Sequence, residues 1–95
     1  MPKLKKPTIA KMIKIVKYIE ENPNTYVRDI ARNLGMNPAT VHRILKHLNE
    51  FLEFVSLSNR VDANLPNLPV FIRLKEGVTA DGIIKFIIAK NELEL

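Results

Sequence analysis

The 95-residue sequence predicts one α+β domain that is mostly helical, with a three-helix core, a two-stranded β-hairpin and an extra C-terminal helix. Two observations carry this prediction. Apolar residues recur at three- and four-residue spacing in segments that end at glycine, proline or asparagine, as in short amphipathic helices. Two β-prone runs, 53–58 and 69–74, flank a turn-forming segment, 59–68, as in a hairpin with a long loop.

The N-terminal region predicts a basic arm followed by a helix. Residues 1–7 contain Pro2 and Pro7 among lysines, so we expect a flexible arm. Thr8 is a suitable N-cap for a helix that ends before Asn22-Pro23, because proline cannot continue a helix. The expected buried face of this helix consists of Ile9, Met12, Ile13, Val16 and Ile19.

The middle of the chain predicts two short helices after a β-prone triplet, 25–27. The first helix runs from Arg28 to Leu34 and ends at Gly35, since glycine readily takes the left-handed conformation of a helix C-terminus. Asn37 is a good N-cap for the second, and Pro38 needs no hydrogen-bond donor at a first helical position. This second helix extends to about residue 51 and buries Val41, Ile44, Leu45 and Leu48.

A last helix is expected from Ala80 to Asn91, with Thr79 as its cap, and it is apolar on nearly every side. A helix of this kind needs burial on more than one side. Its apolar residues are Ile83, Ile84, Phe86, Ile87 and Ile88, and we expect them to face Ile9, Ile13 and Phe71. A second copy of the chain would cover the remainder in a homodimer; the alternative is that the fold buries the whole helix. The expected organisation is an arm, 1–7, a domain, 8–78, and a C-terminal dimerisation helix, 79–95.

Charge and residue usage limit the classes of function. The net charge is +5, and residues 1–17 hold six lysines and no acidic residue, which suits either a polyanionic partner or a solubilising surface. The chain has no cysteine for disulfides or thiolate metal sites. His42 and His47 lack metal-ligand spacing, and the three glycines form no phosphate loop. We therefore expect no enzyme activity, cofactor, metal, membrane segment or evident small-molecule effector, and a cytoplasmic location.

Residues 27–46 carry the functional motif. Ala31 lies where two helices would cross closely, Gly35 follows in the turn and Val41 belongs to the shared core. The rest of that core is expected to comprise Ile30, Leu34, Met36 and Ile44. This order of small, glycine and β-branched residues is the helix-turn-helix pattern. With a helix before it and a hairpin after it, the segment 8–75 resembles the winged helix-turn-helix regulators of the MarR and ArsR kind.

The resemblance implies a sequence-specific regulator of transcription that binds double-stranded DNA with a recognition helix at 38–48 in the major groove. Arg43 has the geometry to read a guanine edge, and Lys46 is expected to contact phosphate. Arg28 and Arg32 could contact the DNA backbone, but Asp29 and Arg32 could equally form a surface pair. The full set of candidate DNA-binding residues is Arg28, Asn37, Pro38, Ala39, Thr40, His42, Arg43, Lys46 and Arg60.

Other basic residues have equally good explanations as solvated surface. Lys3, Lys5 and Lys6 could enter a minor groove or belong to a disordered tail, and Lys11, Lys14 and Lys17 could flank DNA. The hairpin departs from the family, because Arg60 stands alone there and Asp62 follows it. The alternative function is therefore a winged-helix module that binds protein or RNA within a larger assembly.

Overall fold

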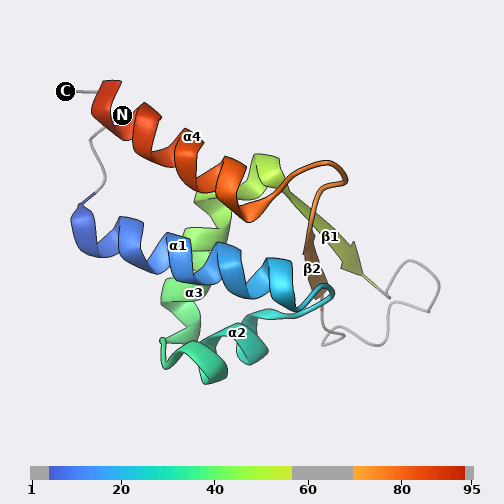
Figure 1. The fold of residues 1–95 in the computed structure, drawn as a ribbon. Helices are drawn as coiled ribbons and strands as arrows, with labels where there is room; N and C mark the ends of the chain where they lie inside the picture. The colour runs from blue at the N-terminus through green and yellow to red at the C-terminus, as the bar shows by residue number, and fades with distance from the viewer. Residues whose placement is uncertain (1–4, 57–69, 94–95) are drawn as a thin grey trace.

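The computed structural model describes residues 5–56 and 70–93 and confirms the expected fold: a mostly helical domain with a two-stranded antiparallel hairpin (Figure 1). The elements follow one another as α1 (Lys6–Glu21), α2 (Val27–Leu34), α3 (Pro38–His47), a 3₁₀ turn η1 (Asn49–Phe51), β1 (Leu52–Ser56), β2 (Val70–Leu74) and α4 (Ala80–Leu93). The loop between the strands, which includes Arg60, lies outside the described residues.

Helix α1 begins earlier than the sequence pattern predicts. Lys6 and Pro7 belong to the helix, not to the arm, and the N-cap is Lys5 instead of Thr8. Proline suits this second helical position, because the backbone N–H groups of a first turn have no partner within the helix. The buried face is also rotated from the expected one: Ile15 is fully buried, whereas Ile9 and Ile13 are only half-buried. Met12, Val16 and Ile19 are buried as expected.

The segment between α1 and α2 forms a bridge to the hairpin instead of a separate strand. Thr25 pairs with Ile72 of β2 as an isolated antiparallel bridge, and Val27 is already the first residue of α2. Two backbone hydrogen bonds make this bridge: Asn24 N–H donates to the Ile72 carbonyl at 3.0 Å, and Ile72 N–H donates to the Thr25 carbonyl at 2.7 Å. The β-prone triplet therefore extends the sheet by one residue.

The helix-turn-helix forms as the sequence predicts, but α3 ends at His47 and not near residue 51, because a separate 3₁₀ turn follows it. Gly35 ends α2 in the left-handed conformation, with φ of 64°, and its N–H donates to the Ala31 carbonyl. Ala31, Ile30 and Val41 are buried between the two helices, and Leu34 and Met36 pack against the same core. The small side chain of Ala31 lets α2 and α3 approach one another closely.

The hairpin pairs Leu52 with Leu74 at its base and Ser56 with Val70 at its far end. Because side chains alternate between faces, Leu52 and Ile72 share the face that meets the helical core, and both are buried. Glu53 and Arg73 are opposite one another on the other face and form an exposed ion pair.

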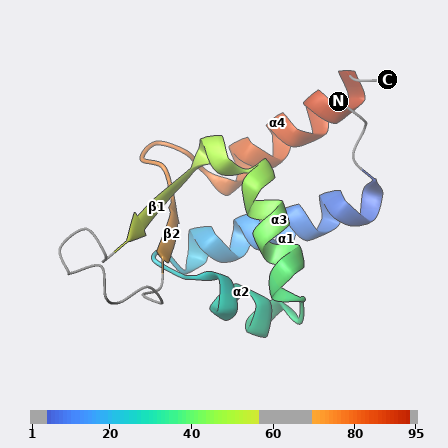
Figure 2. The same cartoon turned by 180° about the vertical axis from the view of Figure 1, so that it is seen from behind.

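Helix α4 lies beside α1 and runs antiparallel to it, so that the first and last helices share one layer (Figures 1 and 2). Ala80, Ile83 and Ile87 are buried, and the Thr79 hydroxyl accepts a hydrogen bond from the Gly82 N–H, as a cap. The expected contact between Phe71 and α4 does not form. Its ring contacts that of Tyr26 edge-on, while Phe86 of α4 contacts Phe51.

Candidate nucleic-acid interface

The N-terminus of α3 is fixed by its own first residues. The Asn37 side chain accepts a hydrogen bond from the Ala39 N–H at 2.7 Å, and Pro38 occupies the first helical position. These three residues are exposed, and Thr40 is half-buried. The first turn of α3 therefore presents small side chains and the positive end of the helix dipole to solvent, which is favourable for contact with an anion.

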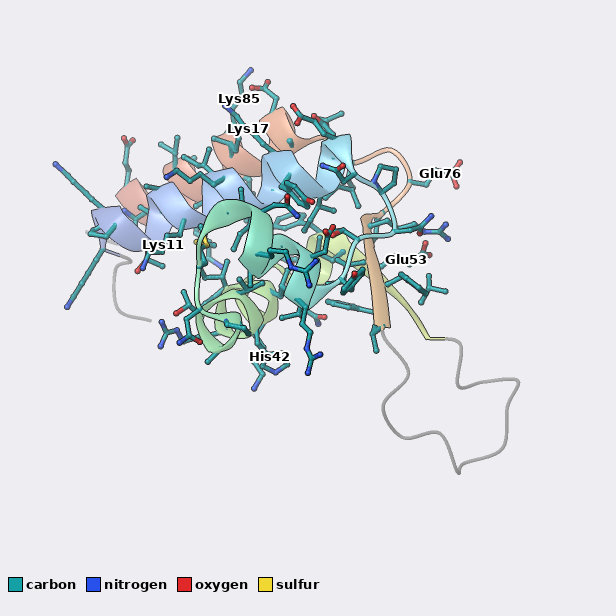
Figure 3. All side chains as sticks on the ribbon, turned by 90° about the horizontal axis from the view of Figure 1, so that it is seen from below. Lys11, Lys17, His42, Glu53, Glu76 and Lys85 are labelled. Atoms are coloured by element: carbon teal, nitrogen blue, oxygen red, sulfur yellow. The ribbon has the colours of Figure 1, made fainter. Side chains whose placement is uncertain are left out.

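One face of α3 is buried and the opposite face is cationic. Val41, Ile44 and Leu45 pack into the core. The other residues of this part of α3 are all exposed: His42, Arg43, Lys46 and His47. His42 lies at the outer edge of the molecule in Figure 3. The helical period thus separates the side chains that hold α3 in place from those that are free to contact a ligand.

Helix α2 adds a cation, Arg28, beside α3. Its residue Asp29 forms hydrogen bonds that hold the start of α2 in place. Arg28 is exposed. Asp29 accepts hydrogen bonds from the hydroxyls of Thr25, at 2.6 Å, and Tyr18, at 2.9 Å. The Thr25 bond, followed by the Tyr18 bond, holds the pKa of the Asp29 carboxyl below its ordinary value.

The predicted alternative of an Asp29–Arg32 surface pair is therefore wrong: Asp29 binds neighbouring hydroxyls and the Asn33 amide, and no Asp29–Arg32 salt bridge occurs among the described residues. For the partner residue Tyr18, burial and then the hydrogen bond to Asp29 raise the pKa of the phenol.

A groove runs between α3 and the hairpin. Two of the cations described above line it, Arg28 and Lys46, together with His42. Apolar side chains complete the lining, among them Tyr26, Phe54 and Val70. Phe54 and Val70 are each 42% exposed. They lie on the same face of the sheet as Leu52 and Ile72, which are buried in the core. The groove therefore combines positive charge with an apolar wall.

The cations of this face have no internal counter-charge. Within residues 5–56 and 70–93, the salt bridges are Arg73–Glu53 and Lys85–Asp81, and neither involves α2 or α3. The same described part of the chain contains no cluster of residues suited to hold a metal ion. Nor does it contain a helix that is long and apolar enough to cross a membrane.

The structure brings three of the described candidate residues together in one groove and adds some that the sequence did not reveal. Arg28, His42 and Lys46 share the groove, and Arg43 is exposed on the same helix. Arg60 lies outside the described residues. Tyr26, Phe54 and Val70 were not among the residues predicted from the sequence. The apolar alternation in the two strands was the available signal, but the point at which the core ends and the groove begins depends on tertiary packing.

Comparison with known proteins agrees with this geometry. Residues 10–50, which span most of α1 together with α2 and α3, match the family described as winged helix-turn-helix DNA-binding. The fold is similar to that of SlyA, described as a transcriptional regulator, with a TM-score of 0.54 and 20% sequence identity. The match covers 95% of this chain and 56% of the SlyA chain, so the chain spans little more than half of SlyA's length. A search of curated proteins found no match.

The family match rests on the helices that carry the cationic face, and the structural match extends over the hairpin and α4. The chain therefore has a winged helix-turn-helix fold, and its residues 10–50 are similar to the winged helix-turn-helix DNA-binding family.

Proposed function

We propose that this chain is a sequence-specific regulator of transcription that binds double-stranded DNA with α3 in the major groove. The observation that carries the proposal is the exposed face of α3, where His42, Arg43 and Lys46 have no carboxylate partner among the described residues. A single helix fits the major groove, and an unpaired guanidinium can donate two hydrogen bonds to a guanine edge.

The candidate residues divide by role. Arg43 is assigned to direct base reading, with His42 and Thr40 beside it, and Ala39 is small enough to contact a thymine methyl group. Lys46 and Arg28 are assigned to phosphates, because they line the groove beside α3. The first turn, Asn37 and Pro38, brings the helix dipole to the DNA backbone. Arg60 is assigned to the minor groove on the sequence alone.

A homodimer through α4 would present two such faces to one duplex. On α4, Phe86 is 45% exposed and Ile88 is 42% exposed, and Ile84 is half-buried. Apolar side chains that remain accessible along one helix favour association with another apolar surface. A two-fold pair would place its recognition helices about one DNA turn, roughly 34 Å, apart.

The test is a mobility-shift titration on duplexes selected from a random pool, at two salt concentrations. Arg43→Ala is expected to weaken specific binding by about 1–3 kcal/mol and to relax preference at one base position. Lys46→Ala is expected to weaken binding to all duplexes uniformly. Arg73→Ala is the control, because it removes a cation from the hairpin face on which Arg73 pairs with Glu53. An equal loss on every sequence for Arg43→Ala would contradict its assignment to base reading.

The second candidate function is a module that binds protein or RNA in a larger assembly. The partly exposed Phe54 and Val70 in the groove favour it, because duplex DNA offers few apolar surfaces. The same titration separates the two functions. Salt-sensitive retention of duplex DNA supports the regulator, and no retention at low salt supports the module.

A further inference from the structure

Helix α1 carries a second basic surface, which we name the lysine stripe: Lys6, Lys14 and Lys17. All three side chains are exposed. Since successive helical residues turn by about 100°, the three project within roughly a quarter of the helix circumference. Glu21 lies in the same arc at the C-terminal end of α1, and the described part of the chain pairs none of the three lysines with a carboxylate.

The contacts of α1 show which way the stripe faces. On one side of the helix, Tyr18 bonds to Asp29 of α2. On the other side, Glu20 accepts a hydrogen bond from the first N–H of α4. The buried residues, such as Ile15 and Ile19, lie between these two sides on the core-facing arc. The stripe occupies the opposite arc, which faces away from the core.

The stripe and the cationic face of α3 point in different directions. Helix α1 lies in front of α3 in Figure 1 and behind it in Figure 2, and α3 packs on α1 through its buried side. In Figure 3, Lys17 lies with Lys85 at the edge of the molecule opposite to His42, and Lys11 lies between these edges. The molecule therefore has two cationic surfaces on opposite sides of one core.

From this arrangement we infer that the lysine stripe binds the phosphate backbone of a second DNA segment, so that the protein bridges two duplexes. The inference rests on the proposed binding of a first duplex by α3. The persistence length of DNA is about 500 Å, so bending one duplex from α3 round to the opposite side of this small domain would carry a large elastic cost. Lysine is suited to phosphate as a point charge, and the stripe has no arginine or aromatic residue for base reading.

The test is capture of a fluorescent duplex by an immobilised duplex in the presence of the full chain. The wild-type protein is expected to capture the second duplex, and Lys6→Gln/Lys14→Gln/Lys17→Gln is expected to reduce capture more than about tenfold. Its affinity for a single selected duplex should change less than about threefold, since α3 is untouched. If each lysine neutralises one phosphate, wild-type capture should fall about 40-fold between 50 and 200 mM salt.

The matched control is Arg73→Gln/Lys75→Gln/Lys90→Gln, which removes the same charge from exposed positions outside α1. This variant is expected to keep capture. Equal loss in both triple variants would reduce the effect to net charge and overturn the inference, as would capture that survives the stripe substitutions. If the wild-type protein binds one duplex but captures no second duplex, the inferred bridging is contradicted and the proposed function is not. Protein that binds no duplex contradicts the proposed function as well.

Discussion

The carboxylate of Glu20, near the end of α1, accepts a hydrogen bond of 2.7 Å from the backbone N–H of Ala80, the first residue of α4. The first N–H groups of a helix have no partner within the helix, so Glu20 acts as a cap supplied by a different element. Its negative charge also lies at the positive end of the α4 dipole. This bond joins α1 to the helix proposed for dimerisation.

Glu20→Ala is expected to lower the free energy of unfolding by about 1 kcal/mol, the usual cost of losing a side-chain cap. Urea denaturation measures the change. The neighbouring Glu21→Ala is the control, because the Glu21 side chain is exposed and has no hydrogen-bond or ion-pair partner among the described residues. A similar loss in both variants would show that general charge, not the bond to Ala80, is responsible.

Gly35→Ala is expected to destabilise the protein by about 1–2 kcal/mol, because Gly35 has a φ of 64° that alanine adopts only at a cost. The effect is one of backbone conformation alone, since an added Cβ would meet nothing within 4 Å. Gly35→Asn is the comparison, because asparagine tolerates the left-handed region better. Thermal unfolding of the two variants checks this, and an equal loss for Ala and Asn would contradict the conformational explanation.

Stability is expected to fall in acid because of Asp29. Its pKa is below the ordinary value of 3.8, chiefly through the Thr25 hydrogen bond and then the Tyr18 bond. A carboxyl with a depressed pKa contributes stability above the unfolded pKa and loses it as the pH falls through the folded pKa. The loss therefore lies below about pH 4. Asp29→Asn is expected to flatten this part of the curve of melting temperature against pH.

Tyr18→Phe provides the matching measurement. It keeps the ring but removes one hydrogen bond that stabilises the charged carboxylate, so the acid limb should become shallower than in the wild type. Asp81→Asn serves as the control, because Asp81 is exposed and bonded only to Lys85. An acid limb that remains unchanged in Asp29→Asn would assign the acid sensitivity to other carboxylates.

Ile88→Lys is expected to weaken the proposed dimer at least about tenfold, because the charged group would have to be buried in an apolar interface. Ile88 is a better target than Phe86, whose ring contacts Phe51 within the same chain. Sedimentation equilibrium measures the association. Ala89→Lys adds the same charge at the next exposed position of α4, on a different side of the helix, and should leave the association unchanged. A wild-type protein that stays monomeric would contradict the proposal.

Local sequence signals were enough to predict the helix-turn-helix, but not the start of α1 or the contacts that hold the helices together. Gly35 and Asn37 mark their helix ends through backbone and capping preferences that act within a few residues, and both predictions are confirmed. The start of α1 was misplaced because Thr8 is a good cap by type, whereas Pro7 is equally suited to a first turn.

Contacts between distant segments could not be predicted from spacing. Glu20 meets Ala80 across 60 residues, and Phe71 meets Tyr26 instead of α4. The exposed face of α3 followed from helical period, since the buried Val41, Ile44 and Leu45 determine what remains outside. The groove did not follow from it, because its walls come from α2, α3 and both strands.

The bridge between Thr25 and Ile72 has a mechanical consequence. Thr25 holds β2 through its backbone and α2 through its hydroxyl bond to Asp29, so one residue links the hairpin to the start of α2. Because Thr25 is bonded to both elements, a tilt of the hairpin would act directly on the start of α2.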